Sequence, residues 1–383
     1  MKILFYLGLG TLVLFEFLKI YFIMPFPGSQ QWDSIDFAYF LHQFRWMFRI
    51  ASLILILAGI PFVVSGKRKW APILCLLTTM GMTAIFNLKM AADAMFKEPN
   101  QLSFHTRESF ELNDSTLVIA IENGGEAKAY PIRYLVYHHQ VRDTLAGQPV
   151  MITYCSVCRT GRVFLPVVDG KPEQFRLVGM DHFNAIFEDS ATESWWQQAT
   201  GSAITGKLKG KKLDEIESIQ LTAGAFFKAY PTGKIMAADP DFLSKYDSLG
   251  KFEKGKSESK LTGTDPFSWN EKSWVLGIRY GGRSKAFDWN DLQEKKIIQD
   301  QIGEESVVII LASDSQSFVA FRRGSGEEFL WKNDTLRSST GKVYSFIGKS
   351  LDDSGEDLER IPAYQEFWHS WKSFHTDSIG PHH

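Results

Sequence analysis

The sequence predicts an α+β protein in which three transmembrane α-helices precede a β-rich soluble domain, duplicated into two related lobes. Three observations lead to this prediction. Long apolar stretches occur only near the N-terminus, the rest of the 383 residues shows short Val/Ile-rich strands with Gly-Gly turns, and one pattern occurs twice. The expected parts are a three-helix membrane anchor (1–95), a first lobe (105–233), a connecting segment (234–272) and a second lobe (273–377).

Three apolar stretches predict the membrane helices, at residues 3–24, 50–65 and 70–88. The first is long enough to cross a hydrocarbon layer of about 30 Å. A cleaved signal peptide is the alternative for this stretch, but the following "IMPFPGSQ" lacks a small-x-small cleavage site. Glu16 and Lys19 lie three positions apart in this helix, so we expect them to pair and thereby reduce the cost of placing charge in a membrane.

A compact basic loop between the second and third stretches predicts the orientation. Lys67, Arg68 and Lys69 are expected to stay in the cytoplasm, so the chain after the third helix would lie on the other side. The predicted location is the bacterial inner membrane, crossed several times, with the C-terminal domain in the periplasm. The lipid bilayer is the predicted partner. No protein partner follows from the sequence, and a formal net charge of −2 predicts no nucleic-acid binding.

A pattern of 47 residues occurs twice in the soluble part. Residues 118–164, the first pattern, align without gaps with residues 275–321, the second pattern, at an offset of 157, and 12 positions are identical. Each pattern predicts a strand, a Gly-Gly hairpin, a second strand, a short helix and two further strands. Between them, "YDSLGKFEKGKSESKLTGTDPFSWNEKS" is rich in Lys, Ser and Gly, which predicts a connecting loop.

The two patterns differ at three chemically distinctive positions. At the offset of 157, the replacements are Cys155 by Ala312, Cys158 by Ser315 and His138 by Lys295. The shaping glycines and many apolar residues are kept while these three side chains are lost together. The first pattern is therefore expected to carry a site that the second lacks.

Cys155 and Cys158 form a C-x-x-C pair between two expected strands, where both sulfur atoms can converge on one point. With His138 they are expected to bind a soft metal ion, copper before zinc, in metal handling or redox maintenance at the cell envelope. Additional ligand candidates are Asp143, Met180, His182 and Asp189, and candidates for a pocket wall are Trp195, Trp196 and Gln198.

Two other interpretations of the cysteine pair remain open. Thiol–disulfide exchange would make the protein an oxidoreductase with Cys155 as the nucleophile, although redox C-x-x-C pairs usually open a helix and "RTGRVFLPV" predicts a strand. A non-catalytic envelope scaffold with structural cysteines is the third interpretation.

Four motifs resemble the family of bacterial and archaeal proteins named domain of unknown function 3179: "EAKAYP", "LVYHHQVRD", "VMITYCSVCRTG" and "DSATESWWQQATGSAITG". The chain departs from that family's usual pattern with His139 in place of Glu and Arg142 in place of Asn. The resemblance implies a domain type and a site, without an established activity. The positions that it implies are His138, Asp143, Cys155, Cys158, Asp189, Thr192, Ser194, Trp196, Gln198 and Gly201.

Overall fold

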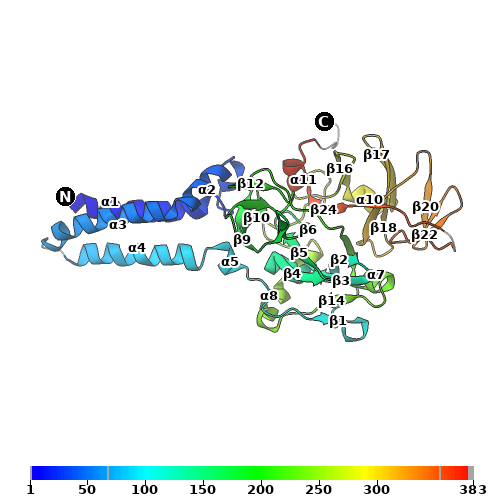
Figure 1. Cartoon of the computed structure of the whole chain (residues 1–383), viewed down its shortest axis with the longest axis horizontal. Helices are drawn as coiled ribbons and strands as arrows, with labels where there is room; N and C mark the ends of the chain where they lie inside the picture. Colours follow the sequence, from blue (N-terminus) through cyan, green and yellow to red (C-terminus); the bar gives the residue numbers. More distant parts are fainter. Residues whose placement is uncertain (1, 67–68, 353–354, 378–383) are drawn as a thin grey trace. The chain divides into compact units, whose positions relative to one another are not determined.

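The computed structural model of the chain describes residues 2–66, 69–352 and 355–377, and its contacts separate two compact units (Figure 1). Unit 1 comprises Met1–Lys97, Glu173–Gln197 and Ser202–Lys212. Unit 2 comprises Glu98–Pro172, Gln198–Gly201 and Leu213–His383. Lys67 and Arg68, on which the predicted orientation depends, lie outside the described residues.

Unit 1 begins with three long helices that are apolar and long enough to cross a membrane, as the sequence predicts. Its helices are α1 (Lys2–Tyr21), α2 (Ile35–Gln43), α3 (Arg45–Val64), α4 (Trp70–Leu88) and α5 (Ala92–Met95). Glycine lets α1 and α3 pack closely, because a Cβ atom at Gly59 would lie 2.4 Å from the backbone nitrogen of Phe5. Small residues at such crossings are typical of helices that pack in membranes.

A buried polar cluster joins these three helices. The predicted pair of Glu16 and Lys19 is confirmed, with 2.9 Å between Oε2 and Nζ. Two residues that the sequence did not single out complete the cluster: Arg49 of α3 lies 2.6 Å from the Glu16 carboxylate, and Asn87 of α4 donates to it at 2.9 Å. The carboxylate is fully buried, so these partners replace the hydrogen bonds that water would otherwise supply.

Unit 1 also contains an antiparallel sheet that packs against the helix ends. Its strands are β9 (Phe175–Asp181), β10 (Asn184–Asp189), β11 (Trp195–Gln197) and β12 (Ala203–Thr205), in the order β12-β11-β10-β9. Ile20 of α1, Ala38 of α2 and Ile186 of β10 share one buried cluster with Trp195. Residues 173–197 and 202–212, which the sequence analysis includes in the first lobe, therefore group by contacts with the N-terminal helices.

The N-terminal part of unit 2 contains a five-stranded sheet and a three-stranded sheet, in the orders β1-β14-β3-β2-β13 and β4-β5-β6. The strands are β1 (Phe104–His105), β2 (Leu117–Asn123), β3 (Glu126–Pro131), β4 (Gln140–Leu145), β5 (Gln148–Cys155), β6 (Thr160–Phe164), β13 (Ile219–Thr222) and β14 (Lys234–Met236), with a small hairpin of β7 (Val167–Val168) and β8 (Lys171–Pro172). The helices are α6 (Ile132–His138), α7 (Ala223–Ala229), α8 (Leu243–Tyr246) and α9 (Gly250–Glu253).

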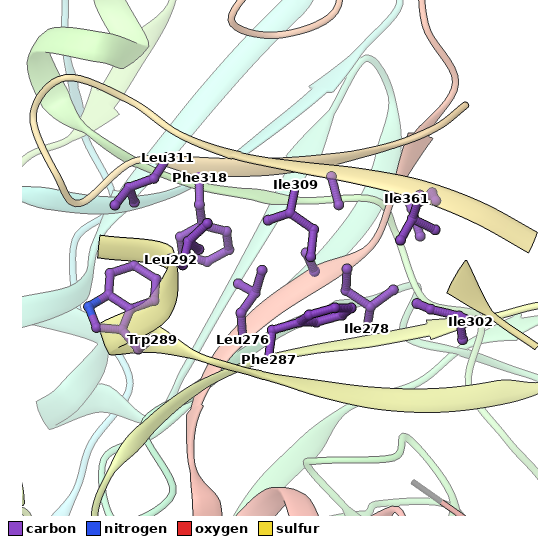
Figure 2. Close-up of a cluster of buried hydrophobic side chains, with 13 residues drawn as sticks. Leu276, Ile278, Phe287, Trp289, Leu292, Ile302, Ile309, Leu311, Phe318 and Ile361 are labelled. Carbon is purple, nitrogen blue, oxygen red and sulfur yellow. The ribbon is translucent and has the colours of Figure 1, made fainter. Parts of the chain in front are cut away.

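The C-terminal part of unit 2 has three sheets, in the orders β16-β15-β24, β17-β18-β19-β23 and β20-β21-β22. The strands are β15 (Trp274–Tyr280), β16 (Arg283–Asp288), β17 (Ile297–Ile302), β18 (Glu305–Leu311), β19 (Phe318–Arg322), β20 (Phe329–Lys332), β21 (Thr335–Ser338), β22 (Val343–Ser345), β23 (Arg360–Ile361) and β24 (Ala363–Phe367). The helices are α10 (Trp289–Lys295) and α11 (Trp368–Phe374). Figure 2 shows the core between the first two sheets, where Leu276 and Ile278 of β15 face Ile309 of β18.

The elements of the two sequence patterns correspond, residue by residue for the first four and to within one residue for the last two strands. Strands β2, β3, β4 and helix α6 begin and end 157 residues before β15, β16, β17 and α10, respectively. Each pattern holds three strands after its helix rather than the two predicted. Each pattern also has a Lys–Asp ion pair at the equivalent positions. Lys128 lies 2.9 Å from Asp143 in the first pattern, and Lys285 lies 2.8 Å from Asp300 in the second.

The segment that connects the patterns is more ordered than the predicted loop. Strand β14 pairs with β1 and β3 in the five-stranded sheet, and α8 and α9 follow it. The Gly and Ser content marks turns correctly, but the aromatic residues Tyr246 and Phe252 are buried and hold the segment against the sheets.

Replacing Leu292 by alanine is expected to lower the free energy of unfolding by about 2–5 kcal/mol, because this side chain is fully buried in the core of Figure 2. Denaturant unfolding of the full chain in detergent, followed by tryptophan fluorescence, measures the loss. Glu294→Ala, on the exposed face of the same helix, is the control and should unfold like the wild type. Equal stability of L292A and wild type would contradict the proposed core.

Candidate functional site

The C-x-x-C motif forms a buried turn between two paired strands, as predicted. Cys155 is the last residue of β5 and pairs with Thr160, the first residue of β6. Cys155 is 2 % exposed and Cys158 is fully buried. Arg159 takes a left-handed conformation (φ 56°), which turns the chain into β6. The two cysteines are thus presented by the ends of one tight turn, and the following residues form a strand instead of a helix.

Two basic side chains from distant parts of the chain lie over this turn. The Lys272 ammonium donates to the Val157 carbonyl at 2.9 Å and to the Leu261 carbonyl at 2.6 Å, and lies 3.1 Å from His369 Nε2. Burial lowers the pKa of Lys272, while the negative charges of Cys158 and Cys155 would raise it. No carboxylate of a described residue forms an ion pair with Lys272, although the charge of Glu271 also acts to raise its pKa.

His369 completes this arrangement as a neutral ring, and its tautomer decides whether Nε2 accepts from Lys272 or donates to Val157. Its Nε2 atom lies 3.1 Å from both Lys272 Nζ and the Val157 carbonyl oxygen. A ring nitrogen cannot donate to a carbonyl and accept from an ammonium at once. Burial, together with the charge of Lys272, lowers the pKa of His369 to about 4. The cluster therefore carries one positive charge near neutral pH, on the lysine.

Arg159, which follows the motif, is buried and fully engaged. Its guanidinium donates to Gln365 at 3.0 Å and to the backbone carbonyls of Phe252 and Glu253 at 3.0 and 2.9 Å. It also lies 3.8 Å from the centre of the Trp274 ring. Because these partners come from α9, β15 and β24, Arg159 ties the motif to three later elements of unit 2.

Arg162 forms the most buried ion pair of the site. Its Nη2 atom lies 2.5 Å from Glu366 Oε1, and both side chains are at most 1 % exposed. Thr160 and Ser370 donate to the same carboxylate at 2.8 and 2.9 Å. The guanidinium also lies 3.3 Å from the centre of the Tyr364 ring. A buried pair with satisfied partners fixes strand β24 against β6.

The predicted third ligand, His138, has other partners. Its Nε2 atom lies 2.6 Å from the Tyr246 hydroxyl, and its ring packs against those of Tyr137 and Phe242. Among the residues that the structure describes, no group of three or more His, Cys, Asp or Glu side chains is placed to hold a metal ion. His138 therefore does not join Cys155 and Cys158 in a three-ligand group.

Two further candidates of unit 2 have structural surroundings. Asp143 accepts from Lys128 at 2.9 Å and from the Tyr130 hydroxyl at 2.7 Å. Burial and the Asp143 charge raise the pKa of Tyr130 well above its usual value, so the hydroxyl remains a donor. Gln198 lies beside the cysteine strands, because its amide donates to Thr153 Oγ1 and to the Thr160 carbonyl, both at 3.1 Å.

The block that contains Asp189, Thr192, Ser194 and Trp196 lies in unit 1 and satisfies itself. The buried Asp189 carboxylate accepts from the Thr192 hydroxyl and the Trp196 indole, both at 2.9 Å, and from the Ser194 amide at 3.1 Å. Since one carboxylate closes the turn between β10 and β11, the spacing D-x-x-T-x-S-x-W has a local structural cause.

The neighbouring carboxylate in unit 1 has an equally complete set of partners. Glu188 accepts from Trp195 Nε1 at 2.8 Å and lies 2.9 Å from His42 and 2.6 Å from Arg176. Burial acts to raise the pKa of Glu188, but the hydrogen bond from His42 and the charge of Arg176 hold it at about 2.

Met180 and His182 belong to unit 1 as well. The backbone of Met180 donates to the Ile23 carbonyl at 2.8 Å, and His182 pairs with Asp181 at 3.0 Å. The predicted site residues are thus divided between the two units, with the cysteines, His138, Asp143 and Gln198 in unit 2.

The sequence analysis missed Lys272, His369 and Glu366. Each lies more than 100 positions from the cysteines, and each sits in a segment whose composition looks ordinary. The available signal was in the motif itself, since "CRTGR" places one arginine at the end of the turn and one in the following strand, and buried guanidinium groups require partners.

Comparisons with known proteins identify a domain type. The model of the family described as Protein of unknown function (DUF3179) matches residues 96–378. No curated protein and no solved structure matches the chain.

Breaking the ion pair between Arg162 and Glu366 is expected to destabilise the protein strongly. Glu366→Leu leaves the buried guanidinium with the longer ion pair to Glu215, at 3.4 Å, and should lower the free energy of unfolding by about 3–5 kcal/mol. The double variant Arg162→Met with Glu366→Leu removes both charges and should recover most of that loss. Denaturant unfolding of the full chain measures the coupling, and additive effects of the two substitutions would show that the side chains do not act as a pair.

Lowering the pH from 6.5 to 4 is expected to destabilise the fold. Burial lowers the pKa of both His139 and His369 to about 4, below the value of about 6.5 in an unfolded chain. The unfolded state then binds more protons, so stability is constant above pH 6.5 and falls by about 1.4 kcal/mol per pH unit for each histidine down to pH 4.

The variant His369→Gln isolates one of these histidines. Denaturant unfolding of this variant at several pH values gives its free energy of unfolding as a function of pH. The slope of that plot should be smaller than the slope for the wild type by the contribution of one histidine. Parallel pH dependences for variant and wild type would contradict a neutral, buried His369.

Proposed function

We propose that this chain, which belongs to the family described as Protein of unknown function (DUF3179), is a membrane-anchored protein that binds one soft metal ion, copper(I) before zinc, through Cys155 and Cys158. The family match also bears out the resemblance drawn from the four sequence motifs. The family carries no activity to transfer, so the proposal is built from the cysteine turn and the groups around it.

The observation that carries the proposal is the half-buried Lys272 ammonium over the turn. Its three hydrogen-bond partners are neutral, being two carbonyl oxygens and His369. An ammonium removed from water favours a negative counter-charge, and among the groups whose charge acts on Lys272 the two cysteines, when ionised, rank before Glu271. Thiolates, rather than thiols, are the form of cysteine that binds metal.

Charge balance favours copper(I) over zinc. Two thiolates and one copper(I) ion leave a net charge of −1, which Lys272 would neutralise. A structural zinc site requires four protein ligands, and the described residues offer no group of three. Soft sulfur ligands suit copper(I), which does not demand the tetrahedral closure that zinc does. His138, with its tyrosine partner, is not needed in this arrangement.

An unsatisfied hydroxyl next to the turn adds support. Tyr154 is fully buried, and its hydroxyl has no hydrogen-bond partner among the described residues. Burial raises the pKa of this hydroxyl, so it stays protonated and available as a donor. Buried hydroxyls without a partner are uncommon in native proteins and tend to mark functional sites.

We interpret the two sequence patterns as a duplication in which the second lobe lost the ligands and now completes the site of the first. Four elements with equal bounds at an offset of 157 residues, and two strands that match within one residue, support this interpretation. The C-terminal part supplies His369 and Glu366, and Lys272 directly precedes it. The second lobe would thus serve as a cover that brings a counter-charge to the cysteines.

We place the protein in the bacterial inner membrane, with the cysteine domain in the periplasm. Helices α1, α3 and α4 support the membrane anchor. The orientation rests on the basic residues between α3 and α4, and copper(I) binding would then belong to metal handling at the cell envelope.

Thiol–disulfide exchange is the second candidate, because a nearby ammonium lowers the pKa of a thiol and increases its reactivity. The burial of both sulfur atoms counts against it, since exchange requires attack by an external thiol or disulfide. A purely structural role is the third candidate.

The test is the metal content of the full chain, purified without oxygen in detergent and exposed to copper(I) or zinc. The wild type is expected to retain about one equivalent of copper(I), and the variant Cys155→Ser with Cys158→Ser none. Lys272→Met should weaken copper binding at least tenfold, because the counter-charge is lost. Cys75→Ser, at the exposed cysteine of α4, and Lys295→Met, at an exposed lysine, are the matched controls and should bind like the wild type.

Each other outcome rejects the metal site. A wild type that retains no metal and shows a reversible disulfide with a measurable potential would establish exchange chemistry instead. A wild type that retains no metal and whose double cysteine variant is as stable as the parent would leave the structural role.

A further inference from the structure

A cavity in unit 2, apart from the cysteine turn, is the basis of a second site. This cavity has a volume of about 880 Å³, within the range of small-molecule sites. It is bordered by the N-terminal end of α7, the turn between β18 and β19, the turn between β20 and β21, and the chain after β22; all of these elements are labelled or adjacent to labels in Figure 1. None of the cysteine-site residues lines it.

The turn between β18 and β19 occupies the position that the C-x-x-C turn occupies in the first pattern. Asp314 makes it rigid, because its carboxylate accepts from the Gln316 and Ser317 amides at 2.8 Å each, from the Ser317 hydroxyl at 2.6 Å and from Thr222 Oγ1 at 2.8 Å. Thr222 is the last residue of β13 and the N-cap of α7. The Asp314 carboxylate therefore also connects the turn to the start of α7. The second pattern has therefore replaced its cysteines with a preorganised polar turn.

Most of the charged side chains that line the cavity are paired within the protein, and Asp314 is held by four neutral hydrogen-bond donors instead of a cation. Asp334 lies 3.2 Å from Lys228, Lys349 lies 2.9 Å from Asp357, and Asp114 is paired with Arg107. An anionic ligand would be repelled by Asp314, and a cationic ligand would find the acceptor positions of that carboxylate filled by its four hydrogen bonds. The cavity thus favours a neutral ligand.

The remaining lining combines neutral hydrogen-bonding groups with an apolar wall. Within the described part of the chain, the side-chain amides of Gln316 and Asn333 make no hydrogen bond to the protein, so both can serve a ligand. Phe346 forms the aromatic part of the wall and packs on Trp331, with ring centres 6.0 Å apart. Ile347 and the exposed Leu351 extend it.

We propose that this cavity binds a neutral oligosaccharide. A sugar ring offers hydroxyl groups at its rim, which match the amides and hydroxyls of the turns, and an apolar C–H face, which matches Phe346 and its neighbours. The cavity volume lies within the range of pockets that enclose small ligands, so it is large enough for a short oligosaccharide. This site does not depend on the metal proposed for the cysteines.

The test is titration calorimetry of the full chain with maltotriose and with triacetylchitotriose, which present plain and N-acetylated sugars. The detergent must be free of sugar, because alkyl maltosides would occupy the site. Saturable binding of at least one oligosaccharide is expected, and inorganic phosphate should produce no heat of binding. The variant Cys155→Ser with Cys158→Ser should bind the sugar as the wild type does, which separates this proposal from the metal site.

Two variants locate the site. Ala225→Phe fills the cavity from α7, and Asn333→Gly removes an amide at a position whose backbone (φ 53°) suits glycine. Each should weaken binding at least tenfold, whereas Glu294→Ala should not. The proposal is overturned if neither oligosaccharide binds at about 10 mM, ten times a Kd of about 1 mM, if phosphate binds instead, or if both cavity variants bind like the wild type.

Discussion

The buried ion pair between Arg162 and Glu366 is the interaction on which the arrangement of unit 2 depends. Arg162 lies on β6, directly after the cysteine turn, and Glu366 lies on β24, near the end of the chain. Neither charge would tolerate burial alone, so the two strands have to meet. Once β24 is fixed, helix α11 follows it, and His369 is brought to the carbonyl of Val157. Arg159 reinforces the contact through Gln365, the neighbour of Glu366.

The contact between β6 and β24 explains why the candidate site in the first sequence pattern requires the C-terminal part of unit 2. The cysteine turn alone would present two sulfur atoms without a counter-charge. In the proposed metal site, Lys272 would supply that charge from the segment just before β15, and His369, kept neutral by burial, would not repel it. The proposed binding of copper(I) thus uses both halves of unit 2, and the polar cavity at the second turn would give the C-terminal half a ligand of its own.

Unit 1 follows the same rule that buried charge must be matched. Glu16, within the apolar helices, is compensated by Lys19, Arg49 and Asn87 from three different helices. Outside the helices, Glu188 and Asp189 each collect several donors from the short strands β10 and β11 and from nearby residues. Such clusters fix the register of the helices and the geometry of the turns. This role explains why charged and tryptophan side chains are buried in unit 1 beside its apolar core.

The sequence by itself determined the elements whose cause is local. Apolar length gave α1, α3 and α4, the Gly-Gly turns gave the hairpins β2–β3 and β15–β16, and the register of the repeat placed Cys155 and Cys158 between two strands. Only the tertiary structure decided which groups surround the cysteines. His138 lies against Tyr246. The groups that contact Val157 of the cysteine turn are Lys272 and His369, which are 115 and 212 positions away in the sequence. The physical reason is that hydrophobic period and turn chemistry act over a few residues, whereas the pairing of buried charges depends on how sheets pack, and no local pattern records that packing.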